Sequence, residues 1–362
     1  LYKKFEAIAN WLHFIIQGGY MNIKDLPRIK LGEVKTPIEK LENLSKNYKN
    51  DIYIKRDDLL GIGLGGNKVR KLEYILGDAL SKNADIVITS GGVQSNHVRL
   101  TIAAANKVGL KAIAVLVGSE PKRYTGNTLL DKVLGAEIHF ADINNKEGLS
   151  TGELNRLLDE EGERLVQEIK SKYEALGKIV YVIPGGGKMP PGIAGYINAT
   201  SEIYAQLQEM RLNADYIVTG VGTASTIASL IIGEKLYNTG IKPIGILVTN
   251  TLGSAKAYAE RVKTEIDGYL KHFGWNLDIT LDDIRLFDAY TGEGYGLPSD
   301  DGLEAIKTLA RSEGLIVDHI YTGKAFAGLL DLSKKEYFGD KNVIFLHTGG
   351  SPALFDLDPD LL

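Results

Sequence analysis

The chain has 362 residues, of which 44% are apolar and 24% are charged, and its formal net charge is −4. This length exceeds the size at which one hydrophobic core usually stops growing, so two domains are expected. A slightly negative charge without a basic block argues against nucleic acid or a membrane surface as the main partner. The absence of cysteine excludes disulfides, thiolate metal sites and a cysteine nucleophile, and it fits a cytoplasmic location. No metal site is predicted.

The first 20 residues differ from the rest of the chain. Their apolar run, residues 11–16, is too short to span a bilayer, and no signal-peptide pattern follows it. Met21 is the first methionine, and an ordered pattern begins soon after it. We therefore expect residues 1–20 to be an N-terminal extension; the alternative is an extra helix packed on the body.

Short apolar runs predict the strands of the protein. They occupy residues 52–54, 86–88, 112–117, 179–183, 217–218, 244–248 and 343–346. They do not alternate with polar residues, which is typical of strands buried on both faces of a parallel sheet. Amphipathic stretches at residues 69–80, 129–134 and 154–169 predict helices between them. This order predicts an α/β protein with right-handed crossovers and helices on both faces of its sheets.

The densest motif precedes the first of these helices. Gly65-Gly66-Asn67 leads into Lys68, so this lysine is expected at the mouth of a helix, where the dipole favours anions. Burial and neighbouring positive charge would favour the neutral amine that a Schiff-base lysine needs. Lys71 follows one turn later and could reach a phosphate at the same place. Taken alone, Lys68 is far more typical of a solvated lysine after a loop, so the prediction depends on the other motifs.

Two further strand ends carry polar groups before a helix. The first offers the hydroxyl of Ser95, the amide of Asn96 and the ring of His97, which can hold a carboxylate or move a proton. Ser95 also suits a plain helix cap. The second reads Thr-Gly-Val-Gly-Thr-Ala-Ser-Thr over residues 219–226, which favours a phosphate cradle at a helix start, with a tight turn as the alternative.

The C-terminal third adds hydroxyl groups at loop and strand ends. Tyr295 lies in a glycine-flanked segment, Tyr321 precedes Thr322-Gly-Lys at a helix start, and Thr348 follows the last apolar run. A tyrosine in such a place is more often a core residue with a satisfied hydroxyl than a catalytic group.

Together, these motifs resemble one family of pyridoxal 5′-phosphate (PLP) enzymes with the tryptophan synthase β-like fold, called fold type II. The branch holds 1-aminocyclopropane-1-carboxylate deaminase and D-cysteine desulfhydrase, and the resemblance covers residues 28–356. The matching segments are Thr36-Pro37, Lys55-Arg56-Asp57-Asp58, Gly65-Gly66-Asn67-Lys68, Gln94-Ser95-Asn96-His97, Gly126-Asn127, Tyr295-Gly296, Tyr321-Thr322-Gly323-Lys324 and His347-Thr348-Gly349-Gly350.

The resemblance implies a role for each candidate residue. Lys68 would hold PLP covalently and then act as a base, and Tyr295 and Tyr321 would face the substrate and assist proton transfer. Ser95, with Asn96 and His97, would bind the substrate carboxylate. The cofactor would be bound by Lys71, Asn96, Gly222, Thr223, Ala224, Ser225, Thr226, Thr322 and Thr348.

Within the family, Thr322, Thr348 and His97 resemble the desulfhydrase pattern. The deaminases carry a glutamate in place of Thr322, a leucine in place of Thr348 and usually a glutamine in place of His97. A threonine near the ring nitrogen makes PLP a weaker electron sink, which suffices when a good β leaving group is present. The resemblance thus implies β-elimination from D-cysteine, with the cyclopropane deaminase and L-cysteate lyase activities as alternatives.

Two departures from the family pattern are visible. The loop at residues 184–188 adds the charge of Lys188, and the phosphate loop has lost glycines, with Ala224 among the replacements. A non-catalytic protein that binds a phosphorylated ligand is therefore kept as an alternative from another class.

The resemblance also implies two doubly wound α/β domains with PLP between them. Residues 21–74 and 184–362 would form a large PLP-binding domain, and residues 75–183 a small one. A small amino acid would be the substrate, and a homodimer is expected because the family is usually dimeric.

Overall fold

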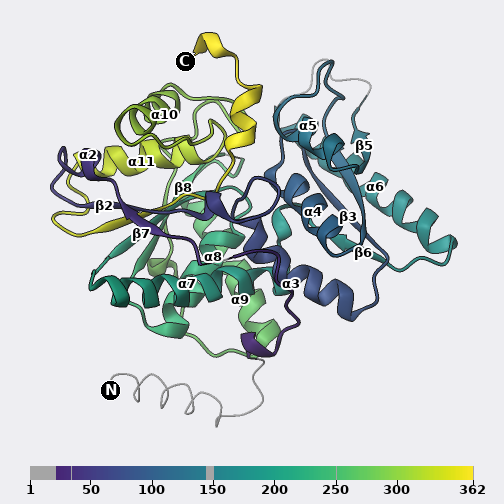
Figure 1. Cartoon of the computed structure of the whole chain (residues 1–362), viewed down its shortest axis with the longest axis horizontal. Coiled ribbons are helices and arrows are strands. Elements are labelled where there is room, and N and C mark those ends of the chain that lie inside the picture. Colours follow the sequence, from purple (N-terminus) through teal and green to yellow (C-terminus); the bar gives the residue numbers. More distant parts are fainter. Residues whose placement is uncertain (1–21, 34, 144–150, 250, 362) are drawn as a thin grey trace.

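The computed structural model describes residues 22–33, 35–143, 151–249 and 251–361, whose strands form two sheets (Figure 1). The larger sheet has the order β1-β2-β10-β7-β8-β9 and the smaller one the order β5-β4-β3-β6. Within these residues every strand pair is parallel except β1 with β2. The strands are β1 (Ile38–Lys40), β2 (Ile52–Lys55), β3 (Ile86–Gly92), β4 (Lys111–Val117), β5 (Glu137–Ala141), β6 (Val180–Ile183), β7 (Tyr216–Val221), β8 (Lys242–Leu247), β9 (Arg285–Phe287) and β10 (Val343–Leu346).

Helices cover both faces of the larger sheet. Ile217 and Ile344 pack toward α7 (Pro190–Met210) and α8 (Ser225–Tyr237), and α9 (Ala255–Phe273) extends this layer. Their neighbours Val218 and Phe345 pack on the opposite face, against α10 (Asp300–Glu313), α11 (Thr322–Lys334) and the short α2 (Glu42–Ser45). Successive residues of each strand therefore enter two different cores, which explains the unbroken apolar runs.

The smaller sheet is covered in the same way. Val87 and Ala114 pack against α3 (Lys68–Ser81) and α4 (Asn96–Lys107), whereas Ile88 and Val115 pack against α6 (Thr151–Ala175). The short α5 (Gly126–Val133) contacts α4 and the 3₁₀ turn η5 (Ser351–Asp356). Helix α3 also packs on α7 of the other layer, so it lies between the two sheets (Figure 1).

The α/β prediction is confirmed, with helices on both faces of both sheets. The seven apolar runs are strands β2, β3, β4, β6, β7, β8 and β10, and the three amphipathic stretches lie in α3, α5 and α6. The strands that the sequence did not indicate, β1, β5 and β9, all lie at sheet edges, where fewer apolar residues are needed.

The domain boundaries remain a prediction. All four strands of the smaller sheet fall within residues 75–183, while α3 runs across the predicted boundary at residue 75. The predicted extension, residues 1–20, lies outside the described residues. Among the described helices, none has the length and apolar character that would allow it to cross a membrane.

Candidate functional site

Backbone packing places Lys68 at the first position of α3. Gly65 has φ +69°, and a Cβ there would lie 1.9 Å from the backbone oxygen of Asp58. A Cβ at Gly349 would lie 2.7 Å from the Cα of Gly66, so the two glycine turns touch backbone to backbone. The N–H of Asn67 donates to the carbonyl of Thr348 at 2.9 Å. The glycines of both motifs therefore allow the loop after β10 to meet the start of α3.

The amine of Lys68 lies in a partly buried, cationic environment. Its Nζ donates to Asn67 Oδ1 at 3.0 Å, and Asn67 Nδ2 donates to Thr226 Oγ1 at 3.3 Å. Burial, followed by the positive charge of Arg99, lowers the pKa of Lys68 to about 8. A substantial fraction of Lys68 is therefore neutral near pH 8, as a nucleophilic or basic lysine requires.

Lys71 lies against the loop at residues 222–226, to which the resemblance also assigns a role in phosphate binding. Lys71 is buried, and its Nζ donates to Ser225 Oγ at 2.5 Å and to Gly186 O at 3.4 Å. In the described part of the chain it has no carboxylate at ion-pair distance. Burial, followed by the charge of Lys68, lowers the pKa of Lys71 well below its usual value.

This environment fits the phosphate of PLP. A buried ammonium without a counter-ion faces the first residue of α8, whose amino end attracts anions. Ala224, just before α8, has φ +65°, so the loop keeps its sharp turn although alanine stands where glycine would be easier. Thr223 packs against Gly186, and a Cβ at Gly222 would lie 3.3 Å from the Tyr321 ring. A phosphate would supply the missing negative charge.

The predicted substrate-binding turn forms the start of α4. Ser95 is its N-cap, and its Oγ accepts from the N–H of Val98 at 3.3 Å. His97 is buried, and its Nε2 lies 2.8 Å from the hydroxyl of Thr89, which itself donates to Ile183 O at 2.9 Å. The ring therefore donates to Thr89. Burial and the charges of the two site lysines lower the pKa of His97 well below its usual value, so it is neutral.

Asn96 is held by a network that sequence reasoning missed. Arg99, fully buried on α4, donates to Asn96 Oδ1 at 3.2 Å, to Asn127 Oδ1 at 2.7 Å and to Gly65 O at 2.9 Å. Asn127 Nδ2 also donates to Asn96 Oδ1 at 3.0 Å. Because both donors bind the oxygen of Asn96, its amide nitrogen stays available as a donor. The signal for this network was a single arginine inside the apolar run at residues 98–105.

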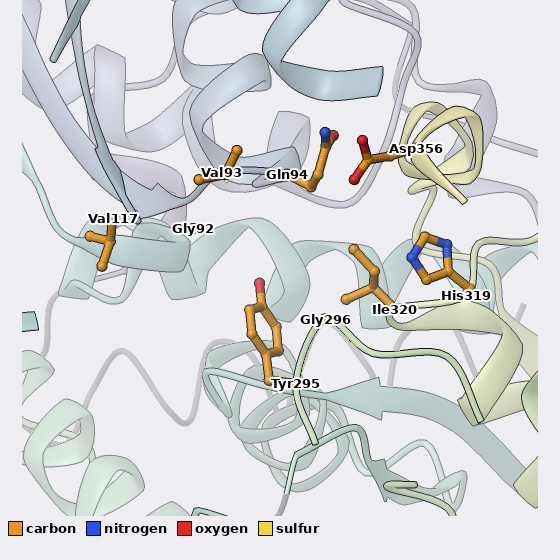
Figure 2. Close-up of a pocket in the computed structure, with 9 residues that line it drawn as sticks. All are labelled: Gly92, Val93, Gln94, Val117, Tyr295, Gly296, His319, Ile320 and Asp356. Atoms are coloured by element: carbon orange, nitrogen blue, oxygen red, sulfur yellow. The ribbon is translucent and has the colours of Figure 1, made fainter. Parts of the chain in front are cut away.

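Tyr295 and Tyr321 form a pair at the edge of a cavity. Their hydroxyls lie 2.5 Å apart. The cavity, of about 240 Å³, is lined by residues from both layers, and the hydroxyl of Tyr295 is directed into it (Figure 2). Burial raises the pKa of both tyrosines, that of Tyr321 well above its usual value. Both hydroxyls therefore stay protonated near neutral pH.

Thr322 is tied to a second residue that sequence reasoning missed, Asp318. The Thr322 hydroxyl donates to Asp318 Oδ2 at 2.5 Å and accepts from the Asp318 N–H at 2.8 Å. The buried carboxylate also accepts from the N–H groups of Ile320, Tyr321 and Thr322. Since the hydroxyl has one proton, it can accept a further hydrogen bond but not donate one.

The extra charge of Lys188 does not reach the cavity. Its Nζ lies 2.6 Å from Glu265 Oε1 of α9, so the charge is paired within the larger layer. In the described residues, no group of histidine and acidic side chains could hold a metal ion. The site therefore presents amines, amides and hydroxyls rather than metal ligands.

Comparison with known proteins identifies the family. Residues 29–349 match the family described as pyridoxal-phosphate dependent enzyme. The chain belongs to this family. PLP is therefore its cofactor, and the prediction of an enzyme with this fold is confirmed.

Two relatives and one solved structure show which members of the family the chain resembles. The chain is 40% identical to a putative 1-aminocyclopropane-1-carboxylate deaminase of Pyrococcus abyssi over 336 residues, which is 93% of this chain and 95% of the relative. It is 39% identical to D-cysteine desulfhydrase of Salmonella typhi over 339 residues, 92% of this chain and 97% of the relative. A solved structure of an ACC deaminase homologue superposes with a TM-score of 0.81, at 37% identity, over 94% of this chain and 96% of that one. The resemblance seen in the motifs is confirmed.

Proposed function

We propose that this enzyme eliminates the β substituent of a small amino acid, and that its main reaction converts D-cysteine and water to pyruvate, hydrogen sulfide and ammonia. The relatives named D-cysteine desulfhydrase, at 39% identity along nearly the whole chain, support this proposal. When bound, PLP supplies an electron sink for the negative charge that develops at Cα.

The side chains of the site fit distinct tasks. Lys71 and residues 222–226 would hold the phosphate, and the free amide nitrogen of Asn96 would donate to the ring hydroxyl of the cofactor. Lys68, with a pKa of about 8, is the group best suited to take the Cα proton. Tyr295 and Tyr321 keep their protons, so they would serve as donors to the substrate or leaving group.

The hydrogen bonding of Thr322 is the observation that favours elimination from D-cysteine over opening of the cyclopropane substrate. Its hydroxyl is already committed to Asp318, so the group expected near the ring nitrogen is a neutral acceptor rather than a carboxylate. A neutral neighbour stabilises a protonated ring less than a carboxylate would. The weaker electron sink suits a substrate that already has a good leaving group, such as hydrosulfide.

A second candidate reaction is the opening and deamination of 1-aminocyclopropane-1-carboxylate to 2-oxobutanoate and ammonia. It is favoured by the relatives of Pyrococcus, at 40% and 41% identity, whose names carry this activity. L-Cysteate is kept as a third substrate to test.

The proposal is tested by supplying PLP-loaded protein with D-cysteine, L-cysteine, L-cysteate and 1-aminocyclopropane-1-carboxylate, and by measuring the 2-oxo acid formed. We expect D-cysteine to be turned over well above the rest. If the cyclopropane substrate is turned over best, Thr322 does not decide the reaction and the argument from its hydrogen bonds fails.

Assembly and location are proposed on separate grounds. Large apolar side chains are exposed, among them Phe355 at 79% and Val133 at 72%, which supports a homodimer that covers them. Light scattering of the purified protein tests this. A cytoplasmic location, supported by the absence of cysteine, would be tested by cell fractionation.

A further inference from the structure

The cavity beside Tyr295 has walls from both layers of the protein. It is lined by Gly92, Val93, Gln94, Val117, Tyr295, Gly296, His319, Ile320 and Asp356. A line of contacts leads to it from the phosphate loop, since Gly222 lies against the ring of Tyr321 and Tyr321 binds Tyr295. The cavity therefore borders the tyrosine pair, which the family resemblance places beside the substrate. The substituent on Cβ of a bound amino acid would have room to enter it.

Among the described residues, four polar side chains line the cavity, and three of them already form hydrogen bonds with other residues. Gln94 accepts from the N–H of Asn127 at 2.8 Å and donates to the carbonyl of Thr125 at 3.3 Å. Asp356 accepts from the hydroxyl of Thr125, and Tyr295 is bonded to Tyr321. These groups shape the cavity without needing a ligand.

His319 is the fourth polar side chain, and its ring forms no hydrogen bond with the described residues. It is 5% exposed, and its buried Nδ1 has no hydrogen-bond partner in the described part of the chain. Its ring lies next to Ile320, on the same side of the cavity as Asp356 (Figure 2). The imidazole ring lines the cavity with its hydrogen-bonding capacity unused, so it can exchange a hydrogen bond with a ligand there.

The charge around the cavity limits what such a ligand can be. None of the described residues that line the cavity is a lysine or an arginine, and Asp356 brings a negative charge to its rim. Burial lowers the pKa of His319, although Asp318 and Asp356 act in the opposite direction, so the ring is neutral near pH 7. An anionic substituent would meet a carboxylate and no cation, whereas a neutral hydroxyl or thiol could exchange a hydrogen bond with the imidazole.

We infer that the cavity beside Tyr295 is a subsite for the β substituent of the substrate, and that His319 binds a neutral, hydrogen-bonding group there. His319 is thus a specificity-determining residue that selects neutral polar substituents over apolar and anionic ones. Its role in turnover rests on the proposed elimination, whereas its role in binding can be measured separately.

The test compares homoserine with norvaline, which differ only by a terminal hydroxyl in place of a methyl group. Each enantiomer is titrated into PLP-loaded protein, and binding is read from the change in cofactor absorbance. We expect homoserine to bind more tightly than norvaline, and His319→Phe to reduce this preference by roughly three- to tenfold, the effect of one lost hydrogen bond. His319→Gln should restore part of the preference, and His272→Phe, at an exposed position of α9, should leave it unchanged.

Two further variants test the inference that the cavity disfavours anionic substituents. Asp356→Asn should improve the binding of cysteate by about threefold, since it removes a like charge. Thr125→Val removes the hydrogen bond to Asp356 but keeps the charge, so it should not improve cysteate binding.

Two results would overturn the inference. The wild-type protein could bind homoserine and norvaline equally well, or His319→Phe could weaken the binding of both ligands by the same factor. The first result needs no variant, so the inference can fail even if His319→Phe does not fold. Pyruvate formation from 3-chloroalanine is measured in parallel. A preference for homoserine without pyruvate would refute the proposed elimination but not the subsite, and pyruvate without the preference would refute only the subsite.

Discussion

Two clusters of buried charge lie on either side of helix α3, and they are built in opposite ways. On one side, Arg70 binds Asp57 at 2.8 Å and Glu202 at 2.7 Å, and Lys55 binds Glu202 at 2.5 Å. Burial acts to raise the pKa of Asp57, but the charge and hydrogen bonds of Arg70, together with Lys55 and Tyr196, outweigh burial and lower the pKa. Each of these buried charges has an opposite charge beside it, as a structural cluster requires.

On the other side, the cations of the site make no ion pair with any of the described residues. Lys68 is bonded to an amide, Lys71 to a hydroxyl and a carbonyl, and Arg99 to two amides and a carbonyl. Burial lowers the pKa of all three, that of Arg99 to about 10. The difference indicates that Asp57, within the motif Lys55-Arg56-Asp57-Asp58, anchors helix α3 through Arg70, whereas Lys68 and Lys71 are left to pair with an anion such as the proposed phosphate.

The largest expected effect is on turnover. Lys68→Ala should remove the covalent link to PLP and lower turnover by roughly a thousandfold or more, because it removes both the anchor and the base. Cofactor absorbance and 2-oxo acid formation measure the two losses, and circular dichroism checks the fold. Lys188→Ala, which removes a paired lysine outside the cavity, is the matched control and should retain activity. A yellow, active Lys68→Ala protein would refute the assignment.

The paired cluster should control stability rather than catalysis. Arg70→Met should lower the free energy of unfolding by about 3–5 kcal/mol, because it removes the cation that binds the buried Asp57 and leaves Glu202 with Lys55 alone. Denaturant unfolding of the cofactor-free protein measures this loss. Arg164→Met removes an exposed ion pair with Glu161 and should change stability by less than about 1 kcal/mol. Equal effects of the two variants would contradict the distinction.

Lys71→Met should have effects of opposite sign on cofactor binding and on stability. Affinity for PLP should fall by roughly tenfold or more, the loss expected when a charged group no longer binds the phosphate. The cofactor-free protein should become no less stable, because an unpaired buried charge has been removed. Spectroscopic titration with PLP measures the affinity, and denaturant unfolding of the cofactor-free protein measures the stability. A clear loss of stability without PLP would show that Lys71 already has its counter-ion.

The lowered pKa of Lys68 predicts a dependence of stability on pH. Between about pH 8, its value in the fold, and the usual value of 10.5, the unfolded chain binds more protons than the folded one. The stability of the cofactor-free protein should therefore rise with pH across this window. Lys68→Met should flatten the rise, by an amount on the order of 1 kcal/mol. Urea unfolding of the wild-type protein and of Lys68→Met at several pH values tests this prediction. If stability depends on pH in the same way in both proteins, the pKa of Lys68 is not lowered.

The smallest expected effect concerns the phosphate loop. Ala224→Gly should stabilise the protein by about 0.5–1 kcal/mol, since glycine adopts the positive φ of this position more easily. PLP affinity should not fall. Ala228→Gly, in the regular part of α8, is the control and should destabilise the protein instead. A loss of stability in Ala224→Gly would show that the alanine side chain contributes more than its backbone costs.

The sequence allowed the central strands and the main site segments to be predicted, because both have local signals. An unbroken apolar run marks a strand such as β4, and Gly65-Gly66 before an amphipathic stretch marks the start of α3. Edge strands such as β9 lack that signal because they are short and only partly buried.

Residues that act through distant contacts could not be predicted in this way. Arg99 lies one helical turn from Asn96, but Asn127 is 31 positions away from Asn96, and only the fold brings it to the other two. Asp318 stands four positions before Thr322, but nothing local shows that its carboxylate receives the hydroxyl. His319 gave no signal either, because its importance depends on the hydrogen bonds that it lacks.

The position of β10 has a consequence for the order of folding. This strand, near the end of the chain, lies between β2 and β7, pairing Val343 with both Ile52 and Tyr216. The smaller sheet uses only residues 86–183, so it can form during synthesis before the larger sheet is complete. The larger sheet closes only when its last strand inserts, which brings Thr348 to the start of α3. We therefore expect the lysine site to be among the last parts to form and to be assembled slowly.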